Sequence, residues 1–440
     1  MKRKQTHTNA EAGETSVSRR DFVRTAAAAT AAVPFLGEGA LAARTAQVSG
    51  KDELRVGLIG CGGRGTGAAV NSIDAADRVR LVAMADVFPD RLKSSRSNLE
   101  QHNSEKATVS DDMCFVGFDA YRQLLEHADV DLVILATPPH FRPMQLQAAI
   151  EAGKHVFMEK PVAVDPVGVR TVIAAGGVAQ RRGLGIVAGT QRRHELCYLD
   201  VMKRIEDGLI GDVVAARCYW NQQGLWHKDP QPEWSDMEWQ LRNWLYFTWL
   251  SGDHICEQHI HNLDVINWAM GGPPTKALGL GGRETRTDPV FGQIFDHHAI
   301  EYEYPDGRFC MSMCRQMDGC ESRVEEVING TKGRSITSSN RARIIGETDW
   351  SFSGKNPNPY VQEHKDLISS IENGTPLNEA KRVAESTLTA IMGRMATYTG
   401  KSVTWDFAMN ESKLDLTPPA YEFGPMPMPP VAVPGRTPLV

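Results

Sequence analysis

The chain has 440 residues, of which 41% are hydrophobic and 23% are charged. This length permits two or three domains of roughly 150 residues, and this composition excludes a disordered or fibrous chain. The balance of 48 Lys and Arg against 54 Asp and Glu gives a net charge of −6, which argues against a broad nucleic-acid-binding surface. No apolar run is long enough to span a bilayer permanently. We therefore expect an acidic globular protein with no membrane span and no nucleic-acid partner.

Residues 1–42 have the pattern of a twin-arginine export signal. Arg19 and Arg20 precede the alanine-rich stretch Ala26 to Pro34, and small residues form a cleavage site that ends at Ala42. An amphipathic first helix is the alternative, but a run of Ala and Thr offers no charged face for one. We predict export to the periplasm or another extracytoplasmic space. A nucleotide cofactor is scarce there, so it would have to be bound tightly before export.

A buried strand predicted over 54–60 leads into the turn GCGGRG at 60–65, which has the G-x-G-x-x-G spacing of dinucleotide-binding loops. In such a turn Gly60 allows the tight bend, Gly62 lets the pyrophosphate approach the backbone, and Gly65 lets the following helix pack on the strand. Backbone N–H groups at the start of that helix face the phosphates, and Arg64 could add a positive charge. The predicted cofactor contacts in this turn are Gly60, Cys61, Gly62, Gly63, Arg64 and Gly65.

A second strand, predicted over 79–85, ends at Asp86, which lies about 20 residues beyond the glycine turn. A carboxylate at that strand tip accepts hydrogen bonds from both ribose hydroxyls and repels a 2′-phosphate. NAD is therefore the expected cofactor. NADP is a less favoured alternative, and it stays open because Arg91 is nearby. Asp86 could also simply cap the end of the strand.

The alternation of strand and helix continues along the next part of the chain. Strands are predicted over 130–136 and 155–158, with a helix over 142–152 between them. This alternation predicts a doubly wound parallel sheet that binds its ligand at the carboxyl ends of the strands. We predict a Rossmann NAD-binding domain over 52–175. Its further cofactor contacts would be Thr137, Pro138, His140, Glu159 and Lys160.

Taken together, the glycine turn, Asp86, the Ala-Thr-Pro at 136–138 and the Glu-Lys-Pro at 159–161 resemble the Gfo/Idh/MocA family of oxidoreductases. Later blocks at 189–193, 252–264 and 392–405 also match in order, and the last resembles the exported twin-arginine branch of the family. The resemblance implies an α/β fold in which a Rossmann domain precedes an α+β domain with a large, open, mostly antiparallel sheet. It also implies that Lys160 lies between the nicotinamide and the substrate.

The family's helix commonly reads Asp-x-x-x-His-x-x-Asp, and Glu257, His261 and Asp264 keep this spacing with glutamate in place of the first aspartate. On one continuous helix Glu257 and His261 would be neighbours, with Asp264 one turn beyond. A carboxylate beside an imidazole orients the ring and stabilises its protonated form. We take His261 as the candidate base and Lys160 as the group that stabilises charge on the reacting oxygen, although either could take the proton.

The resemblance also places a substrate domain over 176–416. Strands are predicted there over 212–220, 277–281, 297–304 and 309–313. The predicted substrate contacts are Arg192, His261, Asp264 and Tyr360, and six tryptophans between 220 and 249 suit either sugar stacking or a core. The proline-rich residues 417–440 would form an arm along a surface or a partner subunit.

A metal site is a further possibility, because His254, Glu257 and His261 would share one helical face and could hold zinc. The family generally needs no metal, so none is expected. The family also implies a homodimer or homotetramer, because one face of the large sheet commonly packs against another subunit. The expected partners are therefore a small carbohydrate and further copies of the chain.

Three functional hypotheses follow. The leading one is an NAD-dependent oxidoreductase that transfers hydride between tightly bound nicotinamide and a hydroxyl carbon of a sugar, glycoside or polyol. The alternative is an NAD-dependent glycosidase that uses transient oxidation and elimination; such relatives often carry Gly-Gly-His-Gly-Gly, and the nearest sequence here is Ser-Gly-Asp-His at 251–254. The third is a non-catalytic module that binds sugar or NAD.

Overall fold

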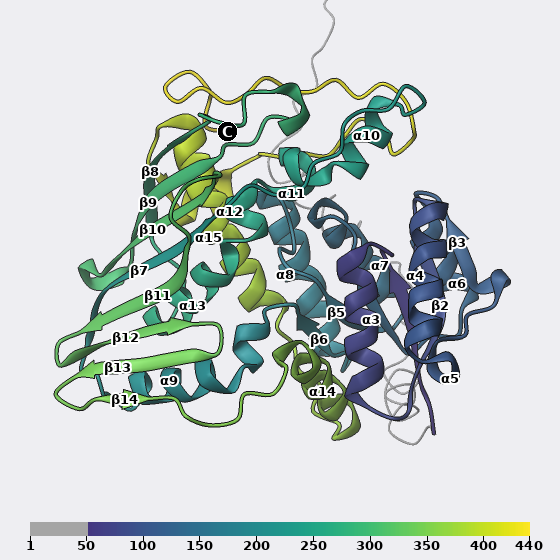
Figure 1. Cartoon of the computed structure of the whole chain (residues 1–440), viewed down its shortest axis with the longest axis horizontal. Helices are drawn as coiled ribbons and strands as arrows, with labels where there is room; N and C mark the ends of the chain where they lie inside the picture. The colour runs from purple at the N-terminus through teal and green to yellow at the C-terminus, as the bar shows by residue number, and fades with distance from the viewer. Residues whose placement is uncertain (1–51) are drawn as a thin grey trace, which may run out of the picture. The chain divides into compact units, whose positions relative to one another are not determined.

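Two β-sheets organise residues 52–440, which are the residues that this computed structural model describes (Figure 1). The predicted export signal, residues 1–42, lies outside them. The first sheet has six parallel strands in the order β3-β2-β1-β4-β5-β6, and the second has nine strands in the order β14-β13-β12-β11-β7-β10-β9-β8-β15. Within the second sheet only β7 and β10 pair in parallel. The expected order of a Rossmann-type sheet followed by a mostly antiparallel sheet is confirmed.

The first sheet is buried on both faces, which is why its strands read as continuous aliphatic runs. Its strands are β1 (Leu54–Ile59), β2 (Val79–Asp86), β3 (Cys114–Val116), β4 (Leu132–Leu135), β5 (His155–Met158) and β6 (Ile186–Ala188). The helices between them are α3 (Gly63–Ala75), α4 (Pro89–His102), α5 (Ser104–Ala107), α6 (Ala120–His127), α7 (Arg142–Glu151) and α8 (Pro166–Arg181). The predicted strands of this domain are confirmed. Strand β3 was not predicted, because three residues are too few to show a periodic pattern of hydrophobic residues.

The predicted domain boundary at residue 175 falls inside α8, and the sheet continues to β6, which pairs with β5. A later helix also belongs to this half of the molecule, because α14 (Pro359–Glu372) lies against α3 (Figure 1). Leu367 and Ile371 of α14 share an apolar cluster with Leu54 and Phe157 of the first sheet. The first domain is therefore not the continuous stretch 52–175, since a segment from far along the chain completes it.

Helices α9 (Leu196–Glu206), α12 (His254–Glu257), α13 (Ile260–Met270) and α15 (Ala380–Thr399) pack against one face of the second sheet (Figure 1). Its strands are β7 (Val213–Gln222), β8 (Lys276–Gly282), β9 (His297–Glu303), β10 (Phe309–Gln316), β11 (Arg323–Gly330), β12 (Gly333–Ser338), β13 (Arg341–Gly346), β14 (Trp350–Ser351) and β15 (Val403–Thr404). This half also contains α10 (Asp236–Arg242) and α11 (Thr248–Ser251). The four predicted strands are confirmed to within a few residues. Among residues 52–440, no helix is both long enough and apolar enough to cross a bilayer.

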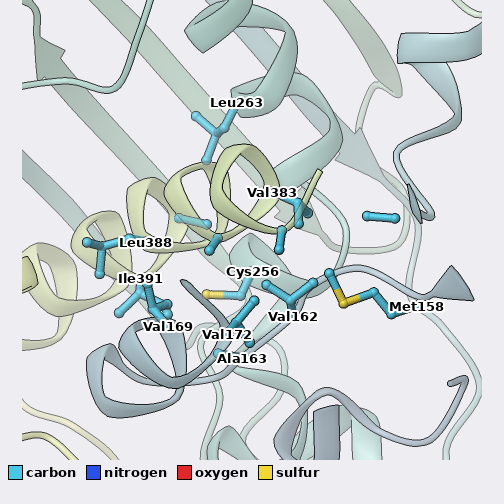
Figure 2. Packing of buried hydrophobic residues seen from close by; sticks show 14 of the residues in the cluster. Met158, Val162, Ala163, Val169, Val172, Cys256, Leu263, Val383, Leu388 and Ile391 are labelled. Carbon is cyan, nitrogen blue, oxygen red and sulfur yellow. The ribbon is translucent and has the colours of Figure 1, made fainter. Parts of the chain in front are cut away.

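The long helix α15 joins the two halves through one apolar core. Ile391 of α15 lies beside Val169 of α8, and Val383 and Leu388 of α15 belong to the same apolar cluster as Cys256 of α12 (Figure 2). Most of the 20 residues of α15 are buried, as expected for a helix that has neighbours on several sides. This core fixes the carboxyl ends of β4 and β5 relative to α12 and α13, and those are the segments that carry the predicted catalytic residues.

Residues 417–440 contain no helix or strand and lie along the surface of their own chain. The ring of Phe423 lies 5.9 Å from that of Phe88 and 5.2 Å from that of Phe118, measured between centroids. The side-chain nitrogen of Gln240 donates to the carbonyl of Met426 at 2.6 Å. The arm thus covers a region that includes Phe88 and Phe118, next to the carboxyl end of β2.

Candidate active site

A cavity of about 720 Å³ opens where the carboxyl ends of the parallel strands face the second half of the molecule. One wall consists of the glycine turn and the segments that follow β2, β4 and β5. The other wall includes Trp220, Gln258 and His261. Lys160 and His261 both line this one space, which is the arrangement that the hydride-transfer hypothesis requires.

The glycine turn has the shape that a dinucleotide needs. A Cβ atom at Gly60, whose φ is +98°, would lie 2.5 Å from the backbone nitrogen of Thr137, and one at Gly65 would lie 1.8 Å from the oxygen of Gly60. At Gly62 or Gly63, by contrast, a Cβ would meet no atom of residues 52–440 within 4 Å. Gly60 and Gly65 therefore shape the turn, while Gly62 and Gly63 leave the start of α3 open to phosphate groups.

Asp86 lies at the end of β2 and lines the cavity. Its carboxylate accepts hydrogen bonds from the backbone N–H of Cys61 at 2.5 Å and of Phe88 at 2.8 Å. Burial raises the pKa of Asp86, although these two bonds oppose the shift. Each carboxylate oxygen keeps a further lone pair for a ribose hydroxyl. Cys61 thus contributes through its backbone alone, since its side chain is buried outside the cavity lining.

Arg64 is not the free cation that the sequence suggested. Its Nε donates to Glu159 at 2.6 Å, and a second nitrogen lies 3.4 Å from Glu363. The guanidinium carbon lies 5.2 Å from the ring centroid of Tyr360, which arrives on α14. Arg64, Glu159 and Tyr360 all line the cavity, but the charge of Arg64 is already balanced by carboxylates. Its main role is to hold Tyr360 and Glu159 at the cavity wall.

A buried arginine that belongs to none of the sequence motifs organises the segments after β4 and β5. Arg142 is 1% exposed; its Nε donates to the carbonyl of Glu159 at 2.9 Å, and a terminal nitrogen donates to the carbonyl of Thr137 at 2.8 Å. Thr137 and Pro138, which are predicted cofactor contacts, line the cavity. An arginine at the start of a helix is normally expected to be exposed, so no sequence signal points to this role.

His140 does not line the main cavity. Its Nε2 shares a hydrogen bond of 2.8 Å with the hydroxyl of Tyr421, and burial lowers its pKa to about 4. The predicted cofactor contact is therefore corrected, because this side chain faces the carboxyl-terminal arm. Tyr421 belongs to the carboxyl-terminal arm, whose Phe423 contacts the cavity-lining residues Phe88 and Phe118.

Lys160 is fixed by Glu257 across the cavity. Its Nζ donates to a carboxylate oxygen of Glu257 at 2.9 Å and also to the Glu257 backbone carbonyl. The prediction of one continuous helix through Glu257 and His261 is wrong. Helix α12 ends at Glu257 and α13 begins at Ile260. The N–H of His261 donates to the carbonyl of Gln258 at 3.3 Å. The break leaves the Glu257 carbonyl without its usual helical partner and free to accept from Lys160.

His261 does not have the neighbouring carboxylate that the helix spacing predicted, and its imidazole is neutral. Burial and the nearby charges of Lys160, Arg192 and Arg64 hold its pKa well below the usual range. Its ring stacks on Trp220, with 5.7 Å between the centroids and 24° between the planes. The prediction failed because the Glu257 carboxylate pairs with Lys160 instead. A neutral imidazole is the form that accepts a proton.

Two predicted substrate contacts lie behind the cavity rather than in its lining. Arg192 forms a buried ion pair with Glu326 and lies 5.6 Å from the ring centroid of Trp220. Asp264 accepts hydrogen bonds from Arg193 at 2.8 Å and from Ser386 at 2.8 Å. Although burial opposes the shift, the surrounding arginines lower the pKa of Asp264 to about 2. Both residues support the wall that carries Trp220 and His261.

The three side chains considered for zinc do not converge. Glu257 and His261 line the cavity, whereas His254 is wholly buried, with its Nδ1 2.9 Å from a carboxylate oxygen of Asp253. Asp253 and His298 complete a buried group of possible ligands around His254. The carboxylate of Asp253 already accepts from the hydroxyl of Tyr398 at 2.6 Å. The break between α12 and α13 explains why the expected common face does not form.

Two stretches of the chain match a known family. Residues 54–182 match the oxidoreductase family with an NAD-binding Rossmann fold, and residues 198–336 match the GFO/IDH/MocA C-terminal domain. Together these stretches take in more than half of the chain. The chain belongs to the Gfo/Idh/MocA oxidoreductase family. The cofactor of the first domain is accordingly NAD, in agreement with the open glycine turn and Asp86.

Individual relatives are distant. A myo-inositol 2-dehydrogenase from Thermotoga maritima is 23% identical over 337 residues, which cover 73% of this chain and 90% of that protein. A glycosyl hydrolase family 109 protein from a Shewanella species is 28% identical over 221 residues, which cover 47% of this chain and 47% of that protein. The chain therefore spans about half the length of that hydrolase.

A solved structure shares the fold of this Gfo/Idh/MocA member. Levoglucosan dehydrogenase in complex with NADH and levoglucosan superposes with a TM-score of 0.64 and 17% identity. The superposition covers 80% of this chain and 99% of that chain. At this identity the likeness concerns the fold, and any statement about the substrate has to come from the site itself.

Proposed function

We propose that this Gfo/Idh/MocA protein is an NAD-dependent oxidoreductase that transfers hydride between a hydroxyl-bearing carbon of a sugar, glycoside or polyol and tightly bound nicotinamide. The observation that carries the proposal is the convergence of Lys160, Glu257 and His261 on the cavity that the glycine turn also lines. The related myo-inositol dehydrogenase and levoglucosan dehydrogenase act on polyhydroxylated substrates, as their names state. Trp220, Trp226 and Trp244 in the lining supply apolar faces for a sugar ring.

The residues divide the chemistry in a simple way. NAD, when bound, supplies the hydride acceptor. The Lys160 ammonium, anchored by Glu257, donates a hydrogen bond to the reacting oxygen and stabilises its developing negative charge. His261 is neutral and takes the hydroxyl proton at a ring nitrogen. Nδ1 of His261 is buried without a hydrogen-bond partner among residues 52–440, so Nε2 is the nitrogen left for the substrate.

The direct test is a panel of sugars, glycosides and polyols given to the NAD-loaded protein. Hydride transfer should appear as the absorbance of reduced nicotinamide, and the Lys160→Ala variant should lose it while still binding NAD. If no member of the panel reduces the cofactor in the native protein although NAD is bound, the protein is a binding module and not an oxidoreductase.

A second candidate function is redox-assisted glycoside cleavage. It is favoured by the partial match to glycosyl hydrolase family 109, and the same catalytic groups would serve it. Chromogenic glycosides separate the two possibilities. Release of the aglycone without accumulation of NADH would establish the glycosidase, whereas accumulation of NADH without release would establish net oxidation.

We further propose export by the twin-arginine route, on the basis of the Arg19-Arg20 pattern. A protein working outside the cytoplasm must keep its NAD, and the contact of Phe423 with Phe88 and Phe118, both in the cavity lining, is a means to retain it. Fusion of residues 1–42 to a folded reporter tests the route. Replacement of both arginines by lysine should leave the reporter in the cytoplasm.

We also propose a homodimer or homotetramer that forms through the open face of the second sheet. Leu280 is 81% exposed on β8, and Leu278, Phe309 and Met313 are also exposed on this sheet. An apolar group of this kind on a sheet face is typical of an interface. Light scattering of the native protein and of Leu280→Lys tests this, because the variant should shift toward the monomer.

A further inference from the structure

Gln258 lines the cavity next to the Lys160–Glu257 pair, and the chemistry described above gives it no role. Its side-chain oxygen accepts a hydrogen bond of 2.9 Å from the side-chain nitrogen of Gln316 on β10. The side-chain oxygen of Gln316 in turn accepts from the guanidinium of Arg286. Gln316 is 1% exposed and Arg286 is 3% exposed, so the three side chains form a relay that runs from the interior to the cavity.

The chemistry of the inner end fixes the direction of this relay. A guanidinium can only donate hydrogen bonds, whereas an amide group can either donate or accept. The oxygen of Gln316 must therefore face Arg286, and its nitrogen must face Gln258. By the same step the oxygen of Gln258 faces Gln316. The orientation of a glutamine amide is ordinarily assigned from its neighbours, and here a donor-only neighbour decides it.

The inner end of the relay is itself held in place. The backbone N–H of Arg286 donates to the buried carboxylate of Asp296 at 3.1 Å. The guanidinium carbon of Arg286 lies 5.1 Å from the ring centroid of Tyr246. Arg286 cannot turn away without breaking buried contacts. It therefore fixes the amide orientation of Gln316, and through Gln316 that of Gln258 at the cavity.

The outer end is open. Gln258 is half-buried, and its amide nitrogen makes no hydrogen bond to any other group in the part of the chain that the structure describes. An N–H₂ group in that position is available to a ligand only as a donor.

We infer that Gln258 is a specificity-determining residue that presents an obligate hydrogen-bond donor to an oxygen of the substrate. The inference rests on the proposed function for the class of that substrate, a polyol or sugar. A hydroxyl or carbonyl oxygen satisfies the amide, whereas an ammonium group at the same place cannot, since it has no lone pair. The cavity should therefore prefer hydroxyl-bearing sugars over their amino counterparts.

Three variants test the relay through the binding of myo-inositol and levoglucosan to the NAD-loaded protein, measured by calorimetry. Gln258→Leu removes the donor. Gln316→Glu reverses the orientation of the Gln258 amide without changing a residue of the cavity lining. A carboxylate accepts hydrogen bonds both from Arg286 and from Gln258. Gln258 must then turn its nitrogen to residue 316 and its oxygen to the substrate. Gln316→Met keeps the size of the side chain and imposes no direction. Thermal unfolding and NAD binding serve as controls for folding.

We expect at least one of the two polyols to bind, with a loss of affinity of about 10- to 100-fold for Gln258→Leu and for Gln316→Glu, and a smaller loss for Gln316→Met. The double variant Gln258→Leu/Gln316→Glu should lose no more than either single variant, because both remove the same donor. Unchanged affinity in Gln316→Glu, additive losses in the double variant, or binding of neither polyol by the native protein would overturn the inference.

The binding readout also separates this inference from the proposed function. Polyol binding that depends on Gln258 but leads to no reduced nicotinamide would support the relay and contradict the oxidoreductase. Reduction of nicotinamide with affinities that none of the variants changes would support the oxidoreductase and overturn the relay.

Discussion

The two walls of the cavity are built in different ways. On the wall of the first domain, Gly60, Asp86 and Thr137 lie at the carboxyl ends of strands of one parallel sheet, so the backbone alone sets their positions. On the opposite wall, side chains from remote strands orient His261 and Gln258. Trp220 on β7 stacks on His261, and Gln316 on β10 bonds to Gln258. A cofactor wall made of backbone tolerates few changes of shape, whereas a substrate wall made of side chains can change its specificity by substitution.

The ion pair between Lys160 and Glu257 joins the two walls. Lys160 follows β5 on the cofactor side, and its partner Glu257 lies at the break between α12 and α13 on the substrate side. Substitutions at this pair should therefore abolish the chemistry, while substitutions farther along either wall should affect cofactor binding or substrate binding separately.

The largest effect is expected for Lys160→Met, which keeps the length of the side chain but removes the charge. Turnover of an oxidised sugar should fall by about 10²- to 10⁴-fold, because the developing charge on the oxygen loses its donor. The affinity for NAD, measured by fluorescence titration, should change little. Turnover close to that of the native protein would show that Lys160 does not act on the substrate.

His261→Asn should reduce turnover by a similar or somewhat smaller factor, about 10²-fold or more. The native pH profile sharpens this test. A base is active when neutral, and the pKa of His261 lies well below its usual value of about 6.5. The value of kcat/KM should therefore stay level as the pH falls from about 8 to about 6.5 and decline only at lower pH. A decline centred at or above about 6.5 would contradict the assignment.

A matched pair of glycine variants tests whether the cofactor wall is a backbone structure. Gly65→Ala forces a Cβ against the oxygen of Gly60, and it should lower the free energy of unfolding by about 1–3 kcal/mol as well as weaken NAD binding. Gly62→Ala meets no protein atom of residues 52–440 within 4 Å, so it should leave stability unchanged. Its NAD affinity should nevertheless fall by roughly tenfold, because the methyl group occupies space for the pyrophosphate. Chemical denaturation and NAD titration measure the two effects.

Asp86→Ser should alter the choice of cofactor without affecting the substrate wall. Loss of the carboxylate removes the repulsion of a 2′-phosphate, and Arg91 in the same lining can then attract that group. The ratio of NADP to NAD affinity should rise by about tenfold or more. An unchanged ratio would mean that Asp86 only caps the strand.

The smallest effect is expected at the carboxyl-terminal arm. Phe423→Ala removes ring contacts with Phe88 and Phe118, and such aromatic pairs contribute about 0.5–1.5 kcal/mol. NAD should leave the variant roughly two- to tenfold faster, with turnover per bound cofactor unchanged. Stopped-flow displacement measures the release, and an unchanged rate would show that the arm does not retain the cofactor.

The sequence by itself determined the part of the cofactor wall that consists of the glycine turn at 60–65 and Asp86. A glycine turn between a strand and a helix, and an acid at the next strand tip, depend on local backbone geometry, so their spacing is visible along the chain. Lys160 and His261, which short motifs that resemble a family single out, both line one cavity. Their motifs could be read because each lies within a few residues of a strand end or a helix start.

Only the tertiary structure decided how these groups act on one another. The break after Glu257 turned an expected Glu–His pair into a Lys–Glu pair and left His261 neutral. Three predicted contacts do not line the cavity because partners from distant segments hold them. Arg192 pairs with a glutamate, Asp264 with an arginine, and His140 bonds to a tyrosine. Such partners are chosen by long-range packing, which has no period in the sequence, and the charge and donor direction of a site depend on them.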